Sequence, residues 1–178
     1  QMAKDAALQA ELERQRLAEE ESNKKRKAAQ DNAMEAVRAA TISMNSEELQ
    51  SSVEAAVNMG LSNEEISVAQ TILANLQLLS DAKLKIDAAL KLLAVKAQTG
   101  LKTNDLSRLK DAIKSGEIVV EKAPQLPFDE LTNAAEMLQT YKSQAGINER
   151  LLSAIDTQDR VTIRKALDEA ENLGLQLD

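Results

Sequence analysis

The chain has 178 residues, a formal net charge of -7 and neither cysteine nor histidine, and its only aromatic residues are Phe128 and Tyr141. The missing cysteine and histidine exclude disulfides and the usual zinc sites, and they remove the side chain that most often transfers protons near neutral pH. The acidic charge disfavours nucleic acid as a partner. No apolar run approaches the roughly 18 residues of a membrane span. We therefore expect a cytoplasmic, non-enzymatic protein without cofactor or metal, built from helices whose core is aliphatic.

Residues 1–44 are predicted to form one long charged helix. Strong helix formers dominate up to about residue 30, and Glu21 and Lys25 stand four residues apart in the favourable order for an ion pair. Three leucines are too sparse for a full core face: Leu8, Leu12 and Leu17. The pattern fits a solvated single helix or one strand of a weak, self-associating coiled coil. From about residue 34 apolar residues recur at helical spacing, so we expect the helix to dock there.

Residues 45–116 are predicted to form a first helical hairpin unit. Ser46 is expected to cap a short helix that stops at Gly60. Ser62 to Glu65 spells Ser-x-x-Glu, the capping-box pattern, directly before a run of apolar residues at helical spacing. A long helix is therefore expected over residues 63–98.

A further short helix and a linker are expected next. Thr103 or Asn104 would cap this helix, and Gly116 would stop it. Residues 117–128 then contain both prolines of the chain, in the sequence Pro124-Gln125-Leu126-Pro127-Phe128. This segment fits a spacer that tucks Leu126 and Phe128 into the bundle, or a polyproline II ligand for an aromatic groove.

Residues 129–178 are predicted to form a second hairpin unit. Asp129 would cap a second long helix, Asp159 would cap a last short helix, and Gly174 would stop it. The expected fold is all-α: a long N-terminal helix followed by an antiparallel helical bundle or a short α-solenoid of alternating short and long helices.

Two stretches of the chain match at a fixed spacing. Leu49-x3-Val53-x2-Ala56-x2-Met59-Gly60-Leu61 aligns with Ile163-x3-Leu167-x2-Ala170-x2-Leu173-Gly174-Leu175. The match predicts tandem helical hairpins that bury their apolar faces only by stacking on neighbours. A chance match between amphipathic helices that end in apolar-Gly-Leu is the alternative. Because a long helix is expected where the second stretch ends, we expect the sequence to be a truncated piece of a longer array.

The candidate site residues are charged. Lys24, Lys25, Arg26 and Lys27 form the only basic run, which could contact an acidic protein surface such as tubulin or actin, or act as a nuclear-import signal. Its simpler interpretation is a solvated helix face. Three carboxylate pairs lie at predicted helix starts, where capping and the helix dipole explain them without catalysis: Glu47/Glu48, Glu64/Glu65 and Asp129/Glu130.

The order of these parts resembles tail or stalk segments of large protist cytoskeletal, myosin-tail and ciliary proteins. The residues that carry the resemblance lie at 11–27, 49–61 and 163–175. Helix periodicity, the repeat and the missing catalytic chemistry predict a non-catalytic segment that acts as a spacer and as a helical surface for protein partners. The resemblance implies that this segment belongs to the cytoskeleton or cilium. Two alternatives stay open: a regulatory helical domain of a larger enzyme, and an amphipathic protein that binds lipid surfaces.

Overall fold

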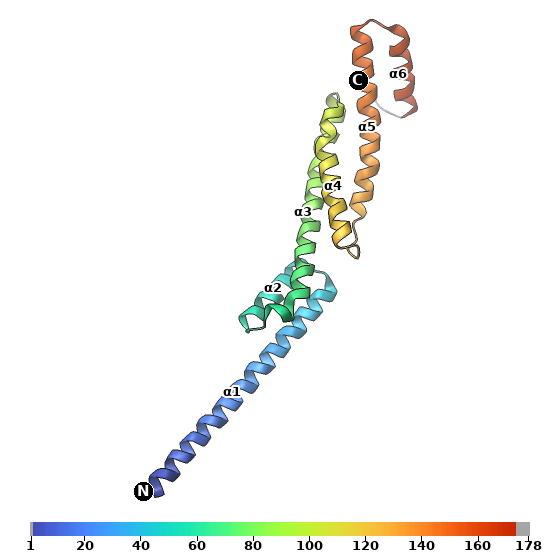
Figure 1. Cartoon of the computed structure of the whole chain (residues 1–178). Coiled ribbons are helices and arrows are strands. Elements are labelled where there is room, and N and C mark those ends of the chain that lie inside the picture. Colours follow the sequence, from blue (N-terminus) through green and yellow to red (C-terminus); the bar gives the residue numbers. More distant parts are fainter. Residues whose placement is uncertain (1, 174–178) are drawn as a thin grey trace. The chain divides into compact units, whose positions relative to one another are not determined.

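The computed structural model describes residues 2–173, with side chains from Leu8 onward, and in this part of the chain helices are the only regular secondary structure. Six α-helices and one 3-10 turn follow in chain order (Figure 1): α1 (Met2–Ser43), α2 (Ser46–Asn58), α3 (Asn63–Thr99), η1 (Thr103–Leu106), α4 (Ser107–Lys122), α5 (Asp129–Asp156) and α6 (Arg160–Asn172). The all-α prediction and the long N-terminal helix are confirmed. Long and short helices alternate along the chain, as the sequence predicted.

The helices form two compact units, Gln1–Leu76 (unit one) and Gln77–Asp178 (unit two). The division falls inside α3, within the segment 45–116 that the sequence assigned to a single hairpin. The first part of α3 belongs to unit one and its longer remainder to unit two, so the apolar pattern of the helix continues across the boundary. The sequence therefore contains no glycine or proline that would mark this boundary.

Unit one has a core made by the end of α1, by α2 and by the start of α3. Its buried residues are Val37, Ala40, Leu49, Val53, Ala56, Ile66 and Ala69. Docking on α1 begins earlier than the predicted residue 34, because Ala33 packs against this core and Gln30 is already half-buried. The side-chain amide of Gln30 donates to the main-chain carbonyl of Met59, at 3.0 Å. A polar contact of this kind is invisible to an analysis of apolar periodicity.

The predicted helix starts and stops in unit one are mostly confirmed. The Ser62–Glu65 capping box forms: the carboxylate of Glu65 accepts from the Ser62 N–H at 2.7 Å, and the Ser62 hydroxyl accepts from the Glu65 N–H at 3.4 Å. Gly60 has a φ of +81°, as expected at a glycine helix stop. The prediction that Ser46 caps α2 is wrong. The cap is Asn45, whose side-chain oxygen accepts from two N–H groups of the first turn, at 3.0 and 3.3 Å.

In unit two, the prediction that Gly116 stops a helix is wrong, because α4 continues through it to Lys122. Gly116 is buried, and a Cβ added there would lie 2.7 Å from Cδ1 of Leu131 and 3.0 Å from the Phe128 ring. The glycine therefore permits a close approach of α4 to the start of α5. The connection between helices is shorter than the predicted linker 117–128 and begins only after Lys122.

The proline segment behaves as a spacer. Leu126 and Phe128 are 6% and 8% exposed, whereas both prolines face solvent. This confirms the expectation that the two apolar side chains tuck into the bundle. It leaves Leu126 and Phe128 inside the fold rather than available to a groove on another protein.

Four further helix termini were predicted, with mixed outcomes. Asp159 caps α6 as expected, accepting from the N–H groups of Val161 and Thr162 at 3.0 and 3.2 Å. Asp129 is the first residue of α5 and not its cap. The prediction that Thr103 or Asn104 caps the next helix is wrong. Both residues lie inside the 3-10 turn η1, which precedes α4. Gly174 and the end of the second repeat stretch lie outside the described residues.

Candidate partner-binding surfaces

Between Leu8 and Ala28, α1 has no packing partner among the described residues of unit one. From Leu8 to Ala28 every side chain is exposed, and we call this stretch the exposed segment. Ion pairs four residues apart run along it, with Arg16 Nε 3.7 Å from Glu20 Oε1 and Lys25 Nζ 2.8 Å from Glu21 Oε1. Its three leucines stay 63%, 57% and 55% exposed: Leu8, Leu12 and Leu17.

The basic run lies within the exposed segment, on α1. Because consecutive helical residues are about 100° apart, its four cations spread around most of the helix circumference instead of forming one face. Lys24 and Lys27 share a face, and Lys25 is engaged by Glu21. Within the run, only Lys24 and Lys27 therefore present two cations side by side on one face. The partner contact expected at Lys24, Lys25, Arg26 and Lys27 stays a prediction.

The three carboxylate pairs lie in the first turns of α2, α3 and α5. Hydrogen bonds from the N–H and hydroxyl of Ser62 lower the pKa of Glu65. The hydrogen bond from Lys83, whose Nζ lies 2.8 Å from Oε1 of Glu130, lowers the pKa of that carboxyl group. A general acid working near neutral pH needs a raised pKa. Glu65 instead stabilises the start of α3, and Glu130 joins α5 to α3 through Lys83.

Polar side chains of α5 hold the end of α3 in unit two. Gln144 is only 8% exposed, and its side-chain amide donates to the carbonyl of Ala97 at 3.2 Å. One turn later the amide of Asn148 donates to the carbonyl of Leu101, also at 3.2 Å. The last carbonyls of a helix lack partners within it. We call Gln144, Asn148 and the adjacent Glu149 the α5 latch.

Glu149 completes the latch at η1. Its two carboxylate oxygens accept from the N–H of Thr103 at 2.8 Å and from the hydroxyl of Thr103 at 2.9 Å. The N–H bond, then the hydroxyl bond, lower the pKa of Glu149. The latch could not be predicted from the sequence, because its hydrogen-bonded partners lie 46 and 47 residues apart. The available signal was a polar Gln-x3-Asn-Glu cluster on one side of α5.

We expect the stability of the chain to fall in acid, partly through Glu149. Because its pKa is lower in the folded chain than the value of about 4.3 in an unfolded chain, its stabilising effect is complete above that value. The effect is lost as the pH falls through the folded-state pKa. Urea unfolding at about pH 7 and about pH 3 measures this. Glu149→Gln should show a smaller loss between the two pH values than the unchanged chain, and an equal loss would contradict the assignment.

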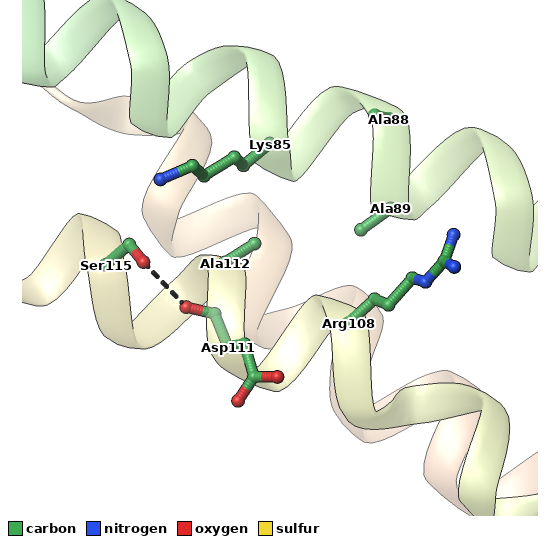
Figure 2. Close-up of a pocket in the computed structure, with 7 residues that line it drawn as sticks. All are labelled: Lys85, Ala88, Ala89, Arg108, Asp111, Ala112 and Ser115. Carbon is green, nitrogen blue, oxygen red and sulfur yellow. Dashed lines mark hydrogen bonds between the residues drawn. The ribbon is translucent and has the colours of Figure 1, made fainter.

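Unit two also carries a shallow groove between α3 and α4. Figure 2 shows its lining: Lys85, Ala88 and Ala89 from α3, and Arg108, Asp111, Ala112 and Ser115 from α4. The volume is about 400 Å³. The Ser115 hydroxyl donates to the main-chain carbonyl of Asp111 at 2.9 Å, not to a base. Small side chains form the floor and two cations flank it, which suits contact with a protein surface better than nucleophilic chemistry.

Unit one has a comparable groove between α1 and α3, with a volume of about 440 Å³. Its lining is mainly apolar: Met34, Val37, Arg38, Thr41, Ile42, Glu65, Val68 and Ala69. Ile42 and Val68 are 82% and 68% exposed. Both grooves are open surfaces between two helices.

No protein-family model, curated protein or solved structure matches the chain. Among residues 2–173, none of the helices combines the length and apolarity needed to cross a membrane. Over the same part of the chain, the acidic side chains form no cluster of three or more that could hold a metal ion.

Proposed function

We propose that this chain is a non-catalytic scaffold segment, in which α1 provides a semi-rigid spacer and the helical hairpins offer surfaces to protein partners. One observation carries the proposal. The exposed segment, Leu8 to Ala28, has every side chain in solvent, yet it continues without a break into the part of α1 that packs on α2 and α3. A spacer needs this combination of an anchored end and an extended, unattached length.

The composition of the exposed segment supports this role. Its residues are mostly strong helix formers, and each ion pair four residues apart adds about 0.2–0.5 kcal/mol to a solvated helix. Opposite charges nearly balance along it, whereas residues 41–178 carry the net negative charge of the chain. At about 1.5 Å per residue, the full 42-residue α1 extends roughly 63 Å.

The hairpin surfaces favour a protein as the partner. Small-molecule sites are usually concave pockets that enclose most of their ligand, whereas the two grooves here are open and lie between helices. The resemblance to cytoskeletal and ciliary tail segments supports a setting in such an assembly. Filaments with acidic surfaces would attract the cations that Lys24 and Lys27 place on one face of α1.

Co-sedimentation with microtubules and with actin filaments tests the proposal. We expect the chain to pellet with one of the two filaments at low salt. The double substitution Lys24→Glu with Lys27→Glu should weaken pelleting roughly several-fold, because the new carboxylates would repel the acidic filament surface. Lys110→Glu with Lys114→Glu is the matched control, since it reverses two exposed cations that lie four residues apart on α4. Failure to pellet with either filament would contradict the cytoskeletal setting.

A further inference from the structure

The groove between α3 and α4 in unit two has a floor of small side chains. Ala89 and Ala112 are 5% and 4% exposed, and Ala88 is exposed at the rim. The side chains at a contact between helices set the distance between the helix axes. A third helix could therefore approach α3 and α4 closely along this groove, provided that its own residues at the contact are also small.

A cation lies at each end of the groove. Figure 2 shows Lys85 of α3 at the same end as Ser115, and Arg108 of α4 at the other end with its guanidinium directed towards α3. Arg108 and Ser115 stand seven residues apart on α4, so the two ends are roughly 10 Å apart at about 1.5 Å per residue. Two carboxylates separated by two turns of a partner helix match this spacing.

Neither cation has an ion-pair partner among the described residues. Asp81 stands four residues before Lys85, and Asp111 stands three residues after Arg108, but neither carboxylate forms an ion pair with its neighbour. Figure 2 shows the carboxylate of Asp111 directed away from α3. Although the whole chain has a net charge of -7, the two cations of this groove thus favour an acidic partner.

A helix suits the groove better than an extended segment. An extended segment needs partners for its main-chain N–H and C=O groups, and the lining here belongs to two helices whose main-chain groups are already paired. The Ser115 hydroxyl in the lining already donates to the main-chain carbonyl of Asp111. A helix satisfies its main-chain groups internally and can pack along the line between two other helices.

We propose that the groove binds an amphipathic α-helix of a partner protein that carries two acidic residues seven positions apart, with small residues between them on the same face. The acidic residues pair with Lys85 and Arg108, and the small residues lie on Ala88, Ala89 and Ala112. This inference rests on the proposed function, because it names the kind of protein that one helical surface receives.

The probe is a fluorescent alanine-based helical peptide, added to the whole chain at low salt and followed by anisotropy. It carries two glutamates seven positions apart on one face, alanines between them on that face, and two lysines on the opposite face. A control peptide of the same composition places the glutamates five positions apart, on different faces of the helix. We expect saturable binding of the first peptide and roughly threefold weaker binding of the control, which can pair with only one cation at a time.

The double substitution Lys85→Gln with Arg108→Gln should weaken binding of the first peptide roughly tenfold, because both ion pairs are lost. Lys110→Gln with Lys114→Gln is the matched control and should leave binding unchanged. It removes the same charge from two exposed lysines that do not line the groove. Since all four side chains are exposed, circular dichroism should show the same helix content in both variants.

Two further variants test the lining itself. Asp111→Asn should strengthen peptide binding, because it removes the negative charge beside Arg108, whereas Glu117→Gln removes an exposed carboxylate of α4 outside the groove and should have no effect. Ala88→Phe should weaken binding, because its ring would occupy the space of the partner helix. Ala94→Phe, at an exposed position of α3 outside the groove, is its control.

Absence of peptide binding, equal binding of the two peptides, or equal weakening by the two lysine-containing pairs of substitutions would overturn the inference. A dimer of the chain that Lys85→Gln with Arg108→Gln abolishes would also overturn it, because a second copy would then occupy the groove. If the chain pellets with a filament while the peptide fails to bind, this inference fails and the proposed function stands. Peptide binding without pelleting would contradict only the cytoskeletal setting.

Discussion

Replacing Leu49 by alanine is expected to lower the free energy of unfolding by about 2–5 kcal/mol, the usual range for removing a fully buried leucine side chain. Leu49 has no exposed surface and lies in the core where α1, α2 and α3 meet. The truncation removes apolar contacts from all three helices at once. The surrounding helices relax only partly, so a cavity remains. The cavity lowers the stability further, beyond the loss of the transfer free energy of the removed atoms.

Val57→Ala is the control for Leu49→Ala. Val57 lies on the same helix but is 48% exposed, so its truncation should change stability by only about 0.5 kcal/mol or so. Urea unfolding followed by circular dichroism measures both changes. Similar losses for the two variants would contradict the assignment of Leu49 to the centre of unit one.

Two glycines inside helices should respond to alanine in opposite directions. A Cβ at Gly116 would lie 2.7 Å from Leu131 and 3.0 Å from the ring of Phe128. Alanine there should destabilise the chain by about 1–3 kcal/mol, because overpacking outweighs the gain in helix propensity. A leucine side chain can turn away, but the Phe128 ring is held in a buried position.

Gly146 is the counterpart on α5, where a Cβ would meet no atom within 4 Å. Gly146→Ala should therefore stabilise the chain by about 0.5–1 kcal/mol, the difference in helix propensity between the two residues. Thermal unfolding of both variants measures the difference in sign. A stabilising Gly116→Ala would show that α4 and α5 do not approach as closely as the structure places them.

The sequence predicted the helices well because their signals are local. The capping box at Ser62, the glycine stop at Gly60 and the cap at Asp159 each rest on atoms within a few residues. At the start of α2 two adjacent residues, Asn45 and Ser46, are both good caps. The sequence pattern alone does not show which of these two adjacent residues is the N-cap.

What the sequence could not predict depends on contacts between distant residues. Gly116 looked like a helix stop, and only the neighbouring Phe128 and Leu131 show that it serves a close helix approach. The α5 latch likewise joins residues more than 40 positions apart. The basic run was recognisable in the sequence, but its spread around α1 follows from the helix geometry.

The central claim is that the exposed segment is a lone, stiff helix anchored at one end. Because the chain has no cysteine, Gln9→Cys with Asn32→Cys places two spin labels at defined positions on α1. Pulsed dipolar spectroscopy on the whole chain should give one narrow distance distribution near 35 Å, at about 1.5 Å per residue, that does not change with protein concentration. A broad distribution at shorter distances, or a second distance that grows with concentration, would contradict the claim.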